Sequence, residues 1–142
     1  MAQLSRDIIE IARCGTQYRA DHFAPMGLKS CHGSYLWEVC RNPGISQDKL
    51  AKRICFNKSN IARQAAALEE GGFLIRRPCE DDKRVMRLYP TEKTLELLPQ
   101  IQQILCSWSG YLTQDLTEEE KELLGTLLAK MKARAADYME EG

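Results

Sequence analysis

Apolar residues recur every three or four positions over most of this chain, the spacing of one face of an α-helix. The first segment follows this spacing and should end near Pro25 and Gly27, because both residues break helices. A second helix is expected from Ser30, whose side chain can cap it, to about Arg41. The apolar or small residues of the first stripe are Leu4, Ile8, Ile11, Gly15 and Tyr18.

Two short helices are expected next, separated by a tight turn. Ser46 can cap the first, which should run to about Ile54, and Asn57 can cap the second. Each of these side chains can accept a hydrogen bond from a free N–H group of the first helical turn. The second helix should stop at Gly71-Gly72, where a residue with positive φ is easily supplied.

After these helices, the spacing of the apolar residues changes from every three or four positions to every second position. Phe73–Arg77 is a short strand candidate, and Arg84–Tyr89 alternates basic and apolar residues as a half-buried strand does. The charged segment between them, residues 78–83, predicts a turn, so the two strands should form a hairpin.

Two further helices complete the pattern. Thr91 can cap a long helix, and Thr117 with Glu120 forms a capping box that opens the last one. The order predicts a mostly α protein with a small β-hairpin wing (α+β class), a winged helix-turn-helix in one domain, residues 1–142. The two apolar stripes are Leu95, Leu98, Ile101, Leu105, Trp108 and Leu112, then Leu124, Leu127, Leu128, Met131, Ala135 and Tyr138.

The formal charge of the whole chain is zero, but its distribution is uneven. Residues 41–93 hold 12 Lys/Arg against 7 Asp/Glu, a net of +5, and residues 94–142 hold 4 against 9, a net of −5. A basic middle suits a polyanionic partner, although an uneven solvated surface would give the same count. No Ser/His/Asp set, phosphate loop or paired acid motif is visible, so we expect no enzyme and no cofactor.

Charged residues interrupt every long apolar stretch near the N-terminus, so no secretory signal and no membrane span are expected. We therefore expect a cytoplasmic protein. The six cysteines are scattered without a CxxC pair, and in a reducing compartment they should be free thiols. His22 with Cys31 and His32 lacks metal-ligand spacing, so no metal site is expected.

The second helix of the pair is the natural reader of DNA, because in this motif it enters the major groove. On a helical wheel Ile61, Ala65 and Leu68 share one face. Arg63 lies opposite and can bond guanine O6 and N7 together. An ordinary amphipathic surface helix would show the same wheel, but the basic hairpin that follows favours DNA binding. The candidate contacts on this helix are Lys58, Ser59, Asn60, Ala62 and Arg63.

At this point the sequence resembles the multiple-antibiotic-resistance regulator (MarR) family. The matching text is GISQDKLA from Gly44, NKSNIAR from Asn57, LEEGGFL from Leu68 and the Asp82-Lys83-Arg84 wing. The resemblance implies that Arg84 enters the minor groove and that Asp82 orients it. A narrow minor groove concentrates negative potential, which attracts arginine. Lys83 and Arg77 join the candidate contacts of the wing.

The resemblance also implies a homodimer on a pseudo-palindromic operator. Residues 30–90 would be the DNA-binding part, and residues 1–25 and 91–142 would be dimerisation helices. A lone domain would expose apolar side chains such as Leu127 and Met131, and large apolar patches usually mark interfaces. The alternative is that all three helices pack within one chain.

Two kinds of signal could release the protein from DNA. The resemblance implies release of DNA by a small aromatic or phenolic effector, with Tyr18, His22, Trp37 and Arg41 as candidate contacts, unless His22 is a core residue. Oxidation is the second, at Cys14 beside Arg13 or at Cys79, which we expect to be exposed on the wing. A free cysteine otherwise behaves as a small hydrophobe.

The function expected from the sequence is a sequence-specific DNA-binding regulator, a repressor released by a ligand or by oxidation. The alternative is a winged-helix protein-interaction module without DNA binding.

Overall fold

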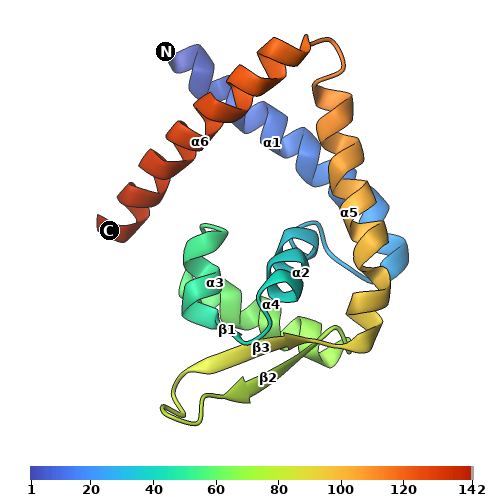
Figure 1. Cartoon of the computed structure of the whole chain (residues 1–142), viewed down its shortest axis with the longest axis vertical. Helices are drawn as coiled ribbons and strands as arrows, with labels where there is room; N and C mark the ends of the chain where they lie inside the picture. Colours follow the sequence, from blue (N-terminus) through green and yellow to red (C-terminus); the bar gives the residue numbers. More distant parts are fainter. Residues whose placement is uncertain (142) are drawn as a thin grey trace. The chain divides into compact units, whose positions relative to one another are not determined.

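The computed structural model describes residues 1–141, and these form six α-helices, one 3₁₀ turn and three strands (Figure 1). The predicted α+β class is therefore confirmed. The elements in chain order are α1 (Ala2–Phe23), the 3₁₀ turn η1 (Ala24–Met26), α2 (His32–Arg41), β1 (Ile45–Ser46), α3 (Gln47–Arg53), α4 (Lys58–Glu70), β2 (Leu74–Pro78), β3 (Met86–Pro90), α5 (Glu92–Leu112) and α6 (Glu118–Glu141).

The chain divides into two compact units. The first, Met1–Trp108, holds α1 to β3 and most of α5, and the second begins at Ser109 and holds the end of α5 and all of α6. The hydrophobic core of the first unit lies where α2, α3 and α4 pack with the sheet. Its largest fully buried side chains are Tyr35, Phe23, Leu36, Leu50, Ile61, Leu68, Leu74, Leu88 and Ile101.

The sheet has the antiparallel order β1-β3-β2, in which Ile45 pairs with Leu88 of β3. The sequence did not predict β1, because two residues are too few to show alternation. Gly44, with a φ of +87°, turns the chain so that its N–H donates to the carbonyl of Leu88 at 2.8 Å. Glycine adopts this left-handed conformation without the steric penalty of a Cβ. The third strand thereby attaches the α2–α3 connection to the wing.

The predicted bounds of the wing strands were partly wrong. The segment from Arg84 to Val85 lies in the turn and not in β3, because Val85 donates its N–H to the carbonyl of Asp82 at 3.0 Å. The carbonyl of Val85 then accepts from the N–H of Cys79 at 2.7 Å, which closes the loop. Arg84 is thus presented at the tip and not along a strand.

The cap predicted at Ser30 is also wrong. Helix α2 begins at His32, and its N-cap residue Cys31 makes no side-chain capping hydrogen bond. The N–H of Lys29 donates instead to Nδ1 of His32 at 3.0 Å. A histidine inside the helix therefore holds the backbone that leads into it.

Candidate nucleic-acid interface

Helices α3 and α4 each begin at a side-chain cap, and a short turn joins them. Ser46 Oγ accepts from the N–H of Lys49 at 3.2 Å, and Asn57 Oδ1 accepts from the N–H of Asn60 at 2.7 Å. Between them Cys55 has a φ of +55°, and Phe56 donates its N–H to the carbonyl of Ala51 at 2.9 Å. This is the bond pattern of a Schellman C-cap, and it fixes the angle at which α4 leaves α3.

Helix α4 buries one face and exposes the other, as its sequence predicts. Ile61, Ala65 and Leu68 are almost fully buried. Of the candidate contacts, Lys58, Ser59 and Arg63 are exposed, and Asn60 and Ala62 are half-buried. The structure therefore gathers all five on or beside the solvent face of one helix, with small side chains around one guanidinium.

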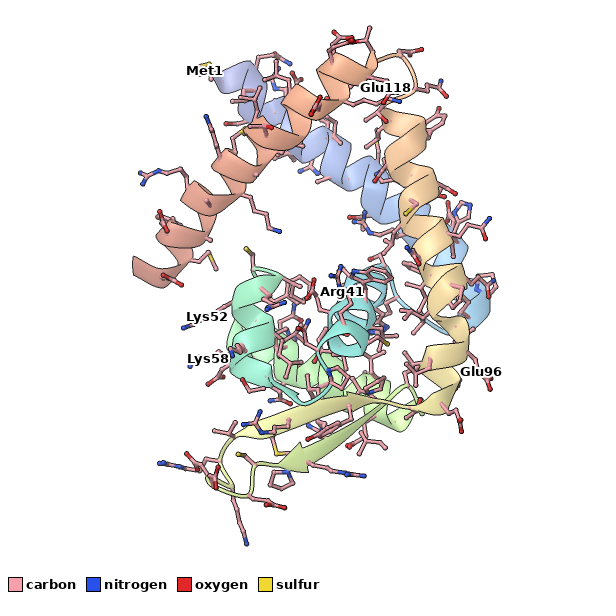
Figure 2. All side chains as sticks on the ribbon, viewed as in Figure 1. Met1, Arg41, Lys52, Lys58, Glu96 and Glu118 are labelled. Carbon is pink, nitrogen blue, oxygen red and sulfur yellow. The ribbon has the colours of Figure 1, made fainter. Side chains whose placement is uncertain are left out.

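The exposed side chains of α4 are only loosely held. Lys58 Nζ lies 3.7 Å from a carboxylate oxygen of Asp48, and both side chains are mostly exposed. An exposed pair of this kind contributes little, so Lys58 is free to exchange its partner for a phosphate. Arg63 donates to Asn60 Oδ1 at 3.4 Å. Lys52 and Lys58 project on the same side of the helix pair (Figure 2).

The wing tip holds a preformed fork. Arg84 donates from Nε and Nη2 to the two carboxylate oxygens of Asp82, at 3.1 and 3.2 Å, and its own N–H donates to Oδ1 at 3.0 Å. These bonds lower the pKa of Asp82 from its ordinary value. The side chain of Arg84 is 91% exposed, so the guanidinium is oriented without being covered.

The other arginines of the wing are tied to the body of the unit. Arg76 makes three hydrogen bonds of 3.0–3.1 Å to the carboxylate of Glu69, which links β2 to the end of α4. Arg77 lies over the ring of Tyr89 at 5.5 Å. Nothing in the sequence indicates that Glu69 and Arg76 meet, so this pair was not predicted.

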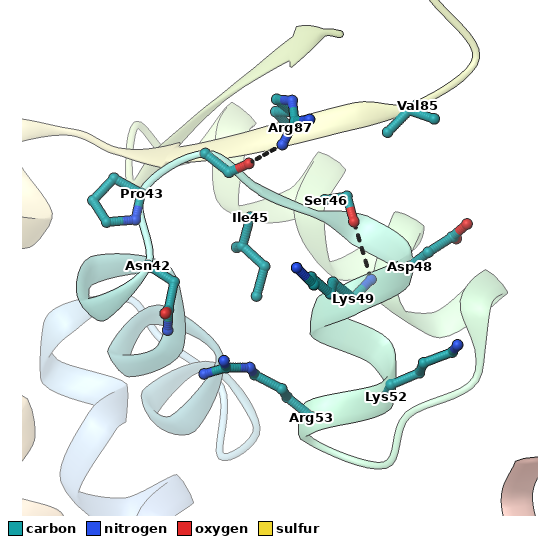
Figure 3. A pocket seen from close by; sticks show the side chains of 11 residues that line it. Asn42, Pro43, Ile45, Ser46, Asp48, Lys49, Lys52, Arg53, Val85 and Arg87 are labelled. Atoms are coloured by element: carbon teal, nitrogen blue, oxygen red, sulfur yellow. Dashed lines mark hydrogen bonds between the residues drawn. The ribbon is translucent and has the colours of Figure 1, made fainter. Parts of the chain in front are cut away.

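A basic pocket of about 570 Å³ lies between α3, β1 and β3 (Figure 3). Lys49, Lys52 and Arg53 line it from α3. Arg87 lines it from β3 and donates to the carbonyl of Gly44 at 2.8 Å. Cations around a hollow of this size suit an anion, and a DNA phosphate is one such group.

The candidate ligand contacts fall into two groups. Tyr18 lies against His22, with ring centroids 4.0 Å apart, and stacks on Trp108 at 5.0 Å. Trp37 forms a separate pair with Arg41, whose guanidinium lies 5.7 Å from the ring centroid. His22 is exposed, so the alternative of a core histidine is wrong. The sequence placed Trp108 on an apolar stripe but did not connect it with Tyr18.

The two candidate redox cysteines differ in exposure. Cys14 is exposed on α1, whereas Cys79 is buried, so the expectation of an exposed Cys79 is wrong. The turn folds back over this residue through the Cys79–Val85 hydrogen bond. A hydrogen bond from Arg87 and the backbone N–H groups of Asp81 and Asp82 lower the pKa of the Cys79 thiol.

Among residues 1–141, no group of three or more His, Cys, Asp or Glu side chains is placed to hold a metal ion. Within the same residues, no helix combines the length and the apolar character that crossing a membrane requires.

Three comparisons place this geometry among known proteins. The model of the MarR family matches residues 31–86. The HTH-type transcriptional regulator YybA of Bacillus subtilis is 30% identical, over 100% of this chain and 97% of the relative. The crystal structure of the transcriptional regulator SlyA is similar at 31% identity, with a TM-score of 0.92 and 96% of each chain covered.

A further similar structure contains DNA. It is that of a MarR family transcriptional regulator from Listeria monocytogenes complexed with 26mer DNA. The identity is 30% and the TM-score 0.89, with 94% of this chain and 89% of the other covered.

Proposed function

Because the chain belongs to the MarR family of transcriptional regulators, we propose that it binds duplex DNA directly and represses transcription from a pseudo-palindromic operator. The observation that carries the proposal is the combination of an exposed Arg63 on α4 with an exposed, carboxylate-oriented Arg84 at the wing tip. Both belong to one compact unit. The DNA complex of the Listeria relative supports the same reading.

In the proposed complex α4 lies in the major groove and the wing reaches the adjacent minor groove. Arg63 reads a guanine, and Lys58 and Ser59 contact phosphates or base edges. Asn60 and Ala62 lie deepest, where a small side chain allows close approach. Arg84 reads groove width while Asp82 limits its motion, and Lys83 and Arg77 neutralise nearby phosphates.

We further propose a homodimer in the cytoplasm, joined through α1, α5 and α6, with residues 30–90 as the DNA-binding part of each copy. The apolar stripe of α6 is exposed within its own unit, which supports a partner for it. Two copies would present two recognition helices about 34 Å apart, one turn of duplex DNA. We propose no catalytic activity, in keeping with relatives that are transcriptional regulators.

The protein-interaction alternative is disfavoured by the charges that remain exposed. Lys58, Arg63 and Arg84 are exposed on α4 and the wing. A surface that docks protein carries fewer charges at its centre and more aromatic residues.

Release of DNA by a signal belongs to the same proposal. The stacked Tyr18, His22 and Trp108 offer flat faces to a small aromatic or phenolic effector. Oxidation is the second candidate signal, at Cys14, which is exposed on α1, or at Cys79, which is buried and whose thiol pKa is lowered towards the reactive thiolate. Adding peroxide or an aromatic acid to the preformed complex, with wild type, Cys79→Ser and Cys14→Ser, separates the two signals.

The main test compares two substitutions on α4. Operators are first selected from random duplex DNA, and affinities are then measured on the selected and on a random duplex at one salt concentration. Arg63→Ala should cost about 1–3 kcal/mol on the operator and much less on random DNA, as expected for a bidentate base contact. Lys58→Ala should weaken both duplexes alike. Equal losses for Arg63→Ala would place its guanidinium on a phosphate, and absence of any selected sequence would end the proposal.

A further inference from the structure

A buried histidine outside the DNA-facing surface is joined to the recognition helix. His32 at the start of α2 is 4% exposed. Its Nε2 lies 2.7 Å from Oε1 of Gln64 on α4, although 32 residues separate the two in the chain. On its other side, Nδ1 accepts from the N–H of Lys29 at 3.0 Å. The imidazole therefore bridges the backbone before α2 and the middle of α4.

The hydrogen bonds around this imidazole can run in only one direction. A backbone N–H always donates, so Nδ1 of His32 must be the acceptor and Nε2 must carry the proton. Nε2 then donates to Oε1 of Gln64, which fixes the orientation of that amide. The Gln64 Nε2 donates in turn to Asn60 Oδ1 at 3.3 Å, the same oxygen that receives Arg63.

The far end of this chain of bonds is the DNA-reading surface. Because Asn60 Oδ1 accepts from Gln64 and Arg63, its amide NH₂ is the group left for a base or a phosphate. An amide turned by 180° would present its oxygen there and would read a different base edge. The orientation of Asn60 is therefore linked, through Gln64, to the Nε2–H of His32.

We propose that His32 is a positioning residue for DNA reading: its neutral form, held at Nδ1 by the N–H of Lys29, orders Gln64 and Asn60 on α4 through its Nε2–H, and protonation of Nδ1 displaces the ring from this position. The proposal rests on the proposed function, and it adds a residue that does not contact DNA and a dependence on pH.

The surroundings of His32 favour its neutral form. Burial is the largest cause that lowers the pKa of His32, the positive charge of Lys29 adds to it, and the bond to Gln64 opposes it. On α4, the group that faces His32 is the neutral Gln64. Arg63 bonds to Asn60, which also accepts from Gln64. Arg19 of α1 and Lys29 act on the thiol of Cys31, the residue before His32. All three charged groups are positive, so none of them would stabilise an imidazolium.

The sign of the pH effect follows from this. A histidine whose pKa is lower in the folded state than in the unfolded chain stabilises the fold fully above its unfolded pKa, about 6.5. That stability is lost as the pH falls below 6.5 and through the lower folded pKa. A proton on Nδ1 would face the N–H of Lys29, two donors with no acceptor between them. The imidazole must then move away from Lys29, and its Nε2–H leaves the position from which it holds Gln64.

The test is the pH dependence of operator affinity between pH 8 and pH 5 at constant ionic strength. The wild type should lose affinity below pH 6.5, by up to about tenfold for each unit by which displacement of the ring raises the pKa of His32. His32→Gln keeps an acceptor and a donor but does not titrate, so its affinity should stay flat.

Two further measurements keep the outcome decisive. Nitrogen chemical shifts of the imidazoles should report the Nε2–H form for His32 at pH 8, and the Nδ1–H form would overturn the proposal. Circular dichroism at each pH should show a constant helix content over the range in which affinity falls. A loss of affinity that only follows loss of helix, or one that persists in His32→Gln, would also overturn it.

Failure of the proposed function has a separate signature. If the wild type binds no selected duplex at pH 8, the DNA-binding proposal fails. The nitrogen shifts would still decide whether His32 orders Gln64, because they require no DNA.

Discussion

The recognition helix α4 and the last helix α6 carry the same kind of apolar stripe and bury it to opposite extents. On α4 the stripe of Ile61, Ala65 and Leu68 is at most 1% exposed, because α2, α3 and the sheet cover it. On α6, Leu127 is 46% and Met131 40% exposed within its own unit. A helical stripe thus shows which face a helix must bury, but it does not show what covers that face.

Helix α1 shows the same difference between buried and exposed apolar residues within the first unit. In α1, Gly15 and Phe23 are buried, whereas Leu4, Ile8 and Ile11 near its start are 41–51% exposed. The same helix therefore contributes one end to the core of its unit and keeps an apolar surface at the other. Substitutions on α6, on α2 and at the wing tip test whether the two stripes differ in this way.

The largest effect is expected from placing charges on the uncovered stripe. Leu127→Asp with Met131→Asp should raise the dimer dissociation constant at least about a hundredfold, since each buried apolar side chain contributes about 1.5–3 kcal/mol. Sedimentation should change from roughly twice 16.2 kDa to 16.2 kDa. Ala129→Asp with Ala133→Asp adds the same charge on the opposite side of α6 and should leave the dimer intact. A wild type that sediments as a monomer at micromolar concentration would refute the dimer.

The second substitution overfills the covered core. An added Cβ at Gly33 of α2 would lie 2.5 Å from two ring carbons of the fully buried Phe23. Gly33→Ala should therefore lower the free energy of unfolding by about 3 kcal/mol, the upper part of the usual range for overpacking. Urea denaturation followed by circular dichroism measures it.

The matched control lies on α6, where a Cβ at Gly125 meets no atom within 4 Å. Gly125→Ala should raise stability by about 0.8–1 kcal/mol through helix propensity alone. Similar destabilisation by both substitutions would contradict the difference between the two regions.

The smallest effect is expected at the wing tip, where the Arg84 side chain belongs neither to the core nor to an apolar surface. Arg84→Ala should leave the free energy of unfolding within about 0.5 kcal/mol of wild type. It should weaken operator binding by about 1.5 kcal/mol, as expected for loss of a charged contact. The loss should be greatest on operators with A/T-rich flanks, where the minor groove is narrow.

Asp82→Ala should copy part of this defect, because it removes the carboxylate that holds the Arg84 guanidinium. Binding is compared at one salt concentration, since phosphate contacts weaken steeply with salt. If Arg84→Ala binds A/T-flanked and G/C-flanked operators as tightly as the wild type does, the wing does not read DNA.

The caps show which predictions from sequence are dependable. Ser46, Asn57, Thr91 and the Thr117–Glu120 box all cap the helices that the sequence assigned to them. Each of these bonds joins residues three positions apart, so local spacing decides it. The hydrogen-bonded pair of Asp82 and Arg84 at the wing tip is equally local, because the two residues are only two positions apart.

Contacts between distant segments could not be predicted in the same way. Ser30 was expected to cap α2, yet the helix begins at His32, whose side chain bonds the N–H of Lys29 and Gln64 of another helix. Cys79 was expected to be exposed, yet the turn covers it. In each case a partner far along the chain, or the path of a loop, outweighed the local preference.

The sequence by itself determined the helices, the caps at Ser46, Asn57, Thr91 and Thr117, the hairpin and the basic residues offered to DNA, because these depend on periodicity and on neighbours within one turn. Only the tertiary structure decided that β1 joins the wing, that Glu69 holds Arg76, and that His32 meets Gln64. Such pairs depend on how separate helices pack around a shared core. Many residues elsewhere in the chain have the chemistry to be the second member of such a pair. The spacing of residues along the chain therefore does not predict which of them makes the contact.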